Sequence, residues 1–169
     1  MCLIPACAAR AEGAAVDPAY ETDAAGLFEG ARLLVVFDGW CGVCTRAMVW
    51  VRAHDAAGRV RALPSQTPGL KERLGLSPAE TARTLWVVTY DGRRLSGAAA
   101  VSAVLRELGG AWALIARLYP VPPLGWLAEH AYAWFARHRD HFARWGTLPA
   151  CARPGVRCEP EGGPVTCAQ

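Results

Sequence analysis

The chain has 169 residues, 53% of them hydrophobic, which is enough for one domain with a sizeable core. Its 18 Lys and Arg residues and 15 Asp and Glu residues leave a net charge of +3, too near balance to argue for nucleic-acid binding. No apolar run approaches the roughly 18–20 residues of a membrane span. The first residues lack the basic start and the long apolar stretch of a secretory signal. We therefore expect a cytoplasmic protein that does not bind nucleic acid.

The elements that the sequence predicts begin with a β-branched apolar run at 32–38, which is typical of a buried strand. From Cys41 the apolar residues recur at helical spacing, and they predict a helix that ends before Gly58. A second short strand is predicted at 60–63, where Pro64 stops it.

The following residues continue the alternation of helices and strands. Segment 69–76 predicts a helical turn, and 77–80 has the sequence of a capping box with Pro at the first helical position. Residues 84–97 alternate around an Asp-Gly pair and predict a hairpin, and 98–108 predicts a helix that two glycines close. This order indicates a small sheet with helices packed against it, an α/β (α+β) architecture.

The C-terminal third is aromatic and then rich in Pro and Gly. Residues 111–145 predict a helix, a Pro-rich break and a longer helix. We favour a helical extension packed on the domain; the alternative is an interfacial helix, which would bring the protein to a partner or a membrane surface. Residues 147–169 predict a disordered tail.

Seven cysteines are scattered along the chain, an odd number that a secreted disulfide framework would rarely have. In a reducing cytoplasm, a C-x-x-C pair is more often catalytic or metal-binding than structural. The cysteines are Cys2, Cys7, Cys41, Cys44, Cys151, Cys158 and Cys167.

The stretch FDGWCGVCTR, residues 37–46, places a C-x-x-C pair between the first predicted strand and the first predicted helix. A free cysteine has a pKa of about 8.5, and a helix N-terminus favours its thiolate through unpaired N–H groups and the helix dipole. A spacing of three residues brings the second sulfur within one turn. The order therefore predicts that Cys41 is the attacking nucleophile and that Cys44, on a more buried stripe, is the resolving thiol.

Three residues before the pair are further candidates for the site. Trp40, with Gly39 beside it, would shield the pair and offer a surface to a substrate. Asp38 has two interpretations. It is a turn or N-cap residue, or it is a carboxylate that takes the proton of Cys44. A carboxylate too close to the pair would also disfavour the thiolate.

The D-x-x-C-x-x-C pattern of Asp38, Cys41 and Cys44 resembles the DCC family of thiol–disulfide oxidoreductases, and the likeness covers about 32–145. The resemblance implies a thioredoxin-like small central sheet flanked by helices, with a C-terminal helical extension. It also implies disulfide reductase activity on Cys41 and Cys44, with Asp38 as the third signature residue and no cofactor. The partners would be a disulfide-containing protein or small molecule and an unknown electron donor.

One feature differs from thioredoxins, which place a cis-proline before the strand that faces the active site. Here the strand that begins at Leu85 follows Ala82-Arg83-Thr84, with no proline. We therefore expect a narrower substrate range than a general grip on extended peptides would give.

With this resemblance, the chain divides into four parts. They are a flexible leader at 1–30, a thioredoxin-like core at 31–110, a helical extension packed on the core at 111–146 and a disordered Pro/Gly/Cys tail at 147–169.

Two other classes of function stay open. Zinc binding would combine Cys41 and Cys44 with the tail cysteines, whose spacing is wider than that of usual zinc ligands. A non-catalytic module would bind a partner through the aromatic helices at 112–145. The tail cysteines themselves have no role in our preferred interpretation; the alternative is a relay that exchanges with the 41–44 pair.

Overall fold

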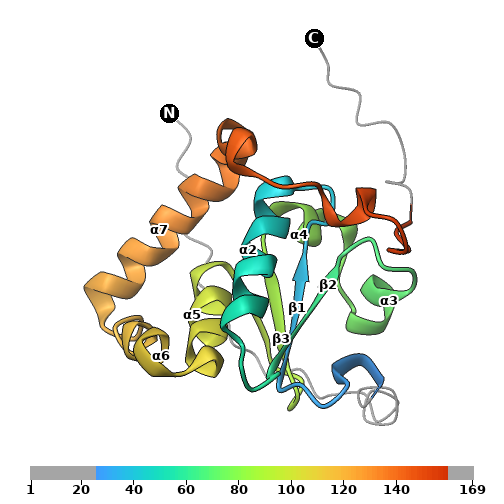
Figure 1. Cartoon of the computed structure of the whole chain (residues 1–169). Coiled ribbons are helices and arrows are strands. Elements are labelled where there is room, and N and C mark those ends of the chain that lie inside the picture. The colour runs from blue at the N-terminus through green and yellow to red at the C-terminus, as the bar shows by residue number, and fades with distance from the viewer. Residues whose placement is uncertain (1–25, 160–169) are drawn as a thin grey trace.

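The most apolar stretch of the sequence forms the centre of a four-stranded sheet. The structure, a computed structural model, describes residues 26–159 and is shown in Figure 1. Strand β1 (Leu33–Phe37) is buried along its whole length. It pairs in parallel with β2 (Val60–Pro64) and antiparallel with β3 (Trp86–Thr89), and β3 pairs antiparallel with β4 (Arg94–Ser96). The strand order is β2-β1-β3-β4.

The side chains of β1 alternate between two apolar cores, one on each face of the sheet. Leu33 and Val35 pack with helix α2 (Gly42–His54) and helix α5 (Gly97–Leu108) on one face. The intervening residues pack on the opposite face with helix α3 (Leu70–Leu74). A β-α-β unit followed by a hairpin and a helix, around a mixed sheet of this order, is a thioredoxin-like arrangement, so the predicted fold class is confirmed.

The predicted capping box is present at the start of helix α4 (Pro78–Arg83). The Ser77 hydroxyl accepts the N–H of Glu80 at 3.3 Å, and the Glu80 carboxylate accepts the N–H of Ser77 at 2.8 Å. The hydrogen bonds from the side chain and then the backbone of Ser77 lower the pKa of Glu80, because they favour its charged form. This helix ends directly before the segment that leads into β3.

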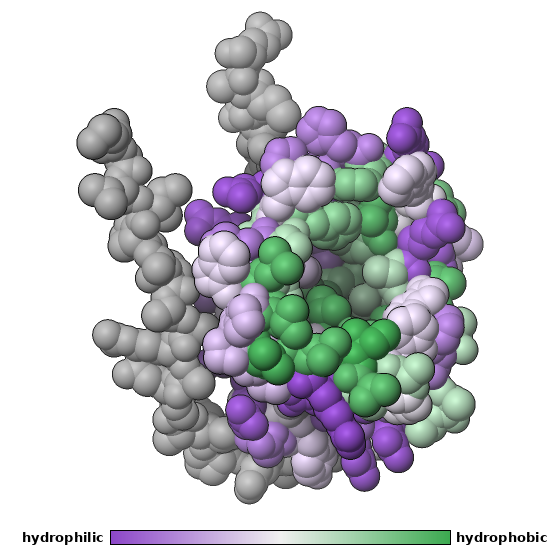
Figure 2. Space-filling view, turned by 90° about the vertical axis from the view of Figure 1, so that its left-hand side faces the viewer, coloured by the Kyte–Doolittle hydropathy of each residue, from purple (hydrophilic) through white to green (hydrophobic). Residues whose placement is uncertain are grey.

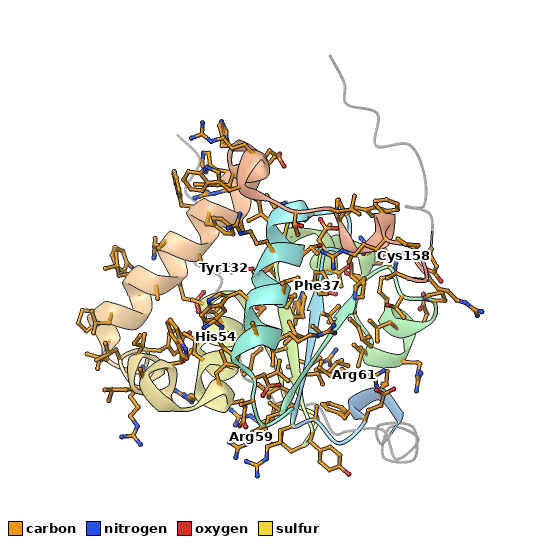
Figure 3. All side chains as sticks on the ribbon, viewed as in Figure 1. Phe37, His54, Arg59, Arg61, Tyr132 and Cys158 are labelled. Atoms are coloured by element: carbon orange, nitrogen blue, oxygen red, sulfur yellow. A yellow bond between two sulfur atoms is a disulfide. The ribbon has the colours of Figure 1, made fainter. Side chains whose placement is uncertain are left out.

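The last residues of the predicted flexible leader belong to the core. Leu27 and Phe28 are 6% and 1% exposed and pack on the same face of the sheet as α3. Arg61 on β2, labelled in Figure 3, donates to the carbonyl of Leu27 at 2.6 Å. The prediction was therefore wrong for residues 26–30, because two large apolar side chains there fill the core. Residues 1–25 lie outside the described residues.

The segment predicted as a helical extension contains helix α6 (Gly110–Ala116), helix α7 (Pro122–His138) and the 3-10 helix η1 (Arg139–Trp145). Helix α7 contacts α5 and forms one edge of the molecule, at the left of Figure 1. None of its residues is buried. Among residues 26–159, no helix is both long enough and apolar enough to cross a membrane.

Helix α7 is attached to α5 through a carboxylate. Glu129 accepts the backbone N–H groups of Ala98 at 3.3 Å and Ala99 at 3.1 Å, both in the first turn of α5. A negative charge at a helix N-terminus interacts favourably with the helix dipole. Glu129 also accepts the hydroxyl of Tyr119 at 2.6 Å. Burial, together with this carboxylate, raises the pKa of Tyr119 to about 12, because both favour the neutral hydroxyl.

We predict that Glu129→Ala lowers the free energy of unfolding by about 1–3 kcal/mol, since hydrogen bonds to charged groups contribute roughly that much. Urea denaturation measures the change. Glu129→Gln keeps one acceptor oxygen and should lose less. Glu72→Ala, which removes an exposed glutamate of α3, is the matched control and should change stability by no more than about 0.5 kcal/mol. Equal losses for Glu129→Ala and Glu72→Ala would contradict the prediction.

Candidate active site

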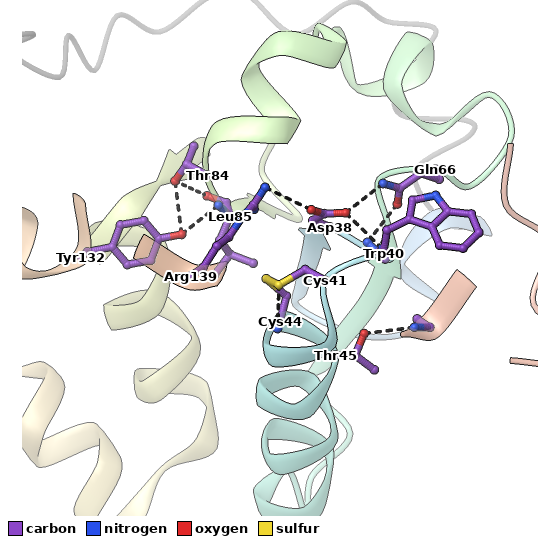
Figure 4. Close-up of a disulfide and its surroundings, with 12 residues drawn as sticks. Asp38, Trp40, Cys41, Cys44, Thr45, Gln66, Thr84, Leu85, Tyr132 and Arg139 are labelled. Carbon is purple, nitrogen blue, oxygen red and sulfur yellow. Dashed lines mark hydrogen bonds and ion pairs between the residues drawn. A yellow bond between two sulfur atoms is a disulfide. The ribbon is translucent and has the colours of Figure 1, made fainter. Parts of the chain in front are cut away.

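The cysteine pair lies where β1 ends and α2 begins (Figure 4). Cys41 is the N-cap residue of α2, and its sulfur accepts the N–H of Cys44 at 3.2 Å. The carbonyl of Cys41 accepts the N–H of Thr45 at 2.9 Å, the first backbone hydrogen bond of the helix. Cys41 and Cys44 are joined in a disulfide, with their Cα atoms 5.2 Å apart. The structure thus has the predicted order of strand, turn, C-x-x-C and helix.

The helix N-terminus favours negative charge on the Cys41 sulfur once the disulfide is reduced. Unpaired N–H groups and the positive end of the helix dipole lie at the N-cap, and the Cys44 N–H already donates to this sulfur. Both cysteines are half-buried, so exposure does not distinguish them in the predicted way. Their positions differ, because Cys41 caps the helix whereas Cys44 lines a cavity between α2 and α7.

Asp38 binds donors from three parts of the chain (Figure 4). Its Oδ1 accepts the N–H of Trp40 at 3.1 Å and the Nε2 of Gln66 at 3.0 Å. Its Oδ2 forms an ion pair with Nη2 of Arg139 at 3.3 Å. The side chain is 15% exposed and lines the same cavity as Cys44. The hydrogen bond to Trp40 is the one expected of a turn residue, and the shared cavity also places the carboxylate on the side of Cys44.

Gly39 has a structural reason to be glycine. Its N–H donates to Oε1 of Gln66 at 2.9 Å, and the residue is buried. A Cβ at this position would lie 2.7 Å from the Cβ of Pro64 and 2.6 Å from the sulfur of Cys151, too close for any side chain. Gly39 therefore fixes the loop and offers no exposed surface to a substrate, which corrects the role expected for it. Trp40 beside it is 41% exposed and remains accessible.

The sequence interpretation missed Gln66 and Arg139. A signal for Gln66 was present, because β1 and β2 pair in parallel with Phe37 opposite Pro64. The residues just after the two strands therefore lie side by side, and Gln66 is a polar residue there. Arg139 comes from the end of α7, and no local pattern connects it to Asp38.

The chain after η1 returns to the active site and covers the N-terminal end of α2. This C-terminal strap, residues 146–159, contains the 3-10 helix η2 (Ala150–Ala152) and a disulfide between Cys151 and Cys158. Four N–H groups of the strap bind the site. They are those of Thr147 to the Gly42 carbonyl (3.1 Å), Ala150 to the Thr45 hydroxyl (3.1 Å), Cys151 to the Gly39 carbonyl (3.1 Å) and Glu159 to the Gln66 carbonyl (2.7 Å).

The predicted disordered tail is therefore wrong for residues 147–159. Their Pro and Gly content suggested disorder, but the backbone hydrogen bonds and the disulfide hold them in place. Residues 160–169 lie outside the described residues. The zinc interpretation would use Cys151 and Cys158, which are bonded to each other. Between residues 26 and 159, no three His, Cys, Asp or Glu side chains gather as a metal site.

We predict that the double variant Cys151→Ser/Cys158→Ser loosens the strap while the 41–44 pair stays intact. Removing a disulfide that closes so short a loop should lower stability by about 2 kcal/mol. Hydrogen exchange followed by NMR should show faster exchange of the Ala150, Cys151 and Glu159 amides. The amides of β1, in the centre of the sheet, are the internal control. The prediction is wrong if the three strap amides stay as protected as in the wild type.

Comparison with known proteins agrees with this geometry. The family described as DCC1-like thiol-disulfide oxidoreductase matches residues 35–145, more than half of the chain. A curated relative, the uncharacterized protein YuxK of Bacillus subtilis (strain 168), is 25% identical over 114 residues, which cover 63% of this chain and 83% of that protein. No solved structure matches. The family match includes Asp38, the cysteine pair and Arg139, and it ends before the cysteines of the strap.

Proposed function

The chain belongs to the DCC1-like thiol–disulfide oxidoreductase family, and on this basis we propose that it reduces disulfides of protein or small-molecule substrates, with Cys41 attacking and Cys44 resolving. The observation that carries the assignment of roles is the position of the Cys41 sulfur, which caps α2 and accepts the Cys44 N–H. A second thiol one helical turn further on can reach the mixed disulfide.

The exchange runs in two steps that together transfer two electrons to the substrate. The Cys41 thiolate attacks one sulfur of the substrate disulfide, forms a mixed disulfide and releases the other sulfur as a thiolate. The Cys44 thiolate then attacks the Cys41 sulfur and releases the second substrate thiol. The product is the Cys41–Cys44 disulfide, and an external thiol donor returns it to the dithiol.

Asp38 is the proposed acceptor for the proton that Cys44 must lose before it attacks. The carboxylate and Cys44 line the same cavity, so the proton need not cross the protein. The ion pair with Arg139 offsets the negative charge of Asp38, which would otherwise oppose formation of a thiolate close by. The proton then passes to the leaving substrate thiolate, so that no net charge accumulates in the site.

The proposal includes a cytoplasmic location, where thiol donors are kept reduced. The expected partners are a disulfide substrate and a thiol donor. The proposal includes no cofactor, because exchange between sulfur atoms uses only the two cysteines.

We predict that Cys44→Ser accumulates mixed disulfides with substrate through Cys41, and that Cys41→Ser does not. Insulin reduction measures turnover, and mass spectrometry of acid-quenched samples identifies the trapped cysteine. Both variants should lose at least about 100-fold in turnover, since each removes one of the two reacting sulfurs.

Accumulation through Cys44 in the Cys41→Ser variant would reverse the roles, and wild-type rates in both variants would refute the enzyme. The reduction potential of the 41–44 pair tests the direction. A value within the cytosolic glutathione range of roughly −220 to −320 mV supports a reductase, and a value near −120 mV indicates an oxidant.

Asp38 is tested by comparing Asp38→Asn with Asp38→Ala. Asn keeps an oxygen for the Trp40 N–H, so it should unfold at a higher urea concentration than Ala. The Asn side chain cannot take a proton, so we expect the Asp38→Asn variant to slow the attack of Cys44 on the mixed disulfide by at least about tenfold. Rapid mixing with a mixed disulfide preformed on Cys41 measures this step at several pH values. If Asn resolves as fast as the wild type, Asp38 only shapes the turn.

A further inference from the structure

In the segment that faces the cysteine pair, one backbone N–H is already bound by helix α7. No peptide bond among residues 26–159 is cis, including the one that joins Thr84 to Leu85. The N–H of Leu85 donates to the hydroxyl of Tyr132 at 2.9 Å, and the hydroxyl of Thr84 lies 3.3 Å from the same oxygen (Figure 4). Helix α7 therefore occupies the N–H of Leu85, one of the backbone groups that an extended substrate could pair with at this position.

A cavity of about 280 Å³ opens beside the disulfide instead. It follows α2 from Cys44 in the first turn to Val51, which at 1.5 Å per residue is about 10 Å of helix. Its other walls come from α5 and α7, for example Val101 and Phe135. Figure 2 looks onto the side of the molecule where α7 lies and shows a hollow with mostly hydrophobic walls.

Polar groups line two parts of this cavity. Thr81, Arg83, Thr84 and Tyr132 contribute to the wall formed by α4, the segment after it and α7, and the other polar groups lie near the cysteine. Asp38 and Arg139 line it together with Cys44, and they are paired with each other. Along α2 beyond Cys44, the residues that line it are Ala47, Met48, Trp50 and Val51, none of them charged.

The hollow is open to solvent, so it is a surface pocket and not an internal void. Its volume is close to the lower end of the range of about 300–1,000 Å³ that small-molecule sites occupy, and such sites also combine apolar walls with a few convergent polar groups. The hollow exists because α7 is held by polar contacts of Glu129 and Tyr132 and has no buried residue of its own to fill the space.

We infer that this cavity binds the apolar group next to the reacting sulfur of the substrate, an aromatic or branched aliphatic side chain. This inference rests on the proposed function. Cys44 lines the cavity and is bonded to Cys41, so a substrate sulfur on Cys41 lies at its mouth and the neighbouring side chain can enter. A charged or amide group would lose hydration without a charged partner along the α2 wall beyond Cys44.

The selection concerns only which disulfide reacts, and the chemistry is unchanged. The substrate disulfide gains two electrons, and Cys41 and Cys44 lose them as their disulfide forms. The first substrate thiolate leaves when Cys41 attacks, and the thiol that carries the bound apolar group leaves when Cys44 resolves.

The test uses the protein with its 41–44 pair reduced, in a single turnover that needs no regenerating donor. Two substrates are compared, the symmetric disulfides of N-acetyl-Phe-Cys-Gly-amide and N-acetyl-Asn-Cys-Gly-amide, which release closely matched thiols. We expect the Phe peptide to react at least about tenfold faster, as burial of one aromatic side chain permits. Equal rates within twofold would overturn the inference.

Two variants narrow the cavity from opposite walls, Val101→Phe on α5 and Ala136→Phe on α7. Each should reduce the Phe-to-Asn rate ratio to below about threefold, and circular dichroism identifies a variant that does not fold. Ala53→Phe, at an exposed position of α2 that does not line the cavity, should keep the wild-type ratio. Wild-type ratios in both cavity variants would also overturn the inference.

Bis(2-hydroxyethyl) disulfide, which has no apolar side chain, separates this inference from the proposed function. If wild-type protein reduces it faster than Cys41→Ser does but shows no peptide preference, only the cavity inference fails. If wild-type protein reduces none of the three disulfides faster than Cys41→Ser, the proposed function fails and the inference fails with it.

Discussion

The Asp38 carboxylate connects the three parts of the chain that build the site. It follows β1 directly, Gln66 reaches it from the end of β2, and Arg139 reaches it from the end of α7. These contacts also resolve a conflict of charges. A carboxylate near a thiolate opposes its formation, but this one has its charge offset by a guanidinium and by two N–H donors. In the mechanism that we propose, Asp38 can therefore lie beside the pair without its full charge opposing the thiolate of Cys41.

The C-terminal strap supports the same loop from the opposite side. Its amides occupy the carbonyls of Gly39 and Gly42, on either side of Cys41. The family match ends at residue 145, before this strap. The strap and its disulfide, which support the active-site loop, thus lie outside the residues that match the family.

Local patterns were sufficient to predict the core and the cysteine pair, because the elements there are specified by residues close together in sequence. The run ahead of Asp38 is apolar on both faces of the strand, and Ser77 and Glu80 form their cap across three residues. The contacts that complete the site are long-range. Arg139 meets Asp38 only because α7 packs on α5, and Cys151 pairs with Cys158 in a segment whose composition indicates disorder. Such pairings depend on tertiary geometry, which periodicity does not encode. The burial of Gly39 could not be predicted from local sequence either, since Pro64 and Cys151, which are distant in sequence, cover it.

In the function that we propose, the core supplies the reacting sulfurs and the extension limits which substrates reach them. The C-x-x-C pair at a helix N-terminus determines which bond reacts, and that part of the fold is common to thioredoxin-like proteins. What can approach the pair depends on α7, whose Tyr132 occupies the backbone N–H of Leu85 and whose Phe135 lines the cavity. A surface that pairs with backbone accepts almost any extended peptide, because every peptide has the same N–H and C=O groups. A cavity with apolar walls discriminates by side chain, because a polar group loses its hydration on entry and finds no replacement. A protein that has an apolar cavity in place of a backbone-pairing surface selects different substrates, while the chemistry at sulfur stays the same.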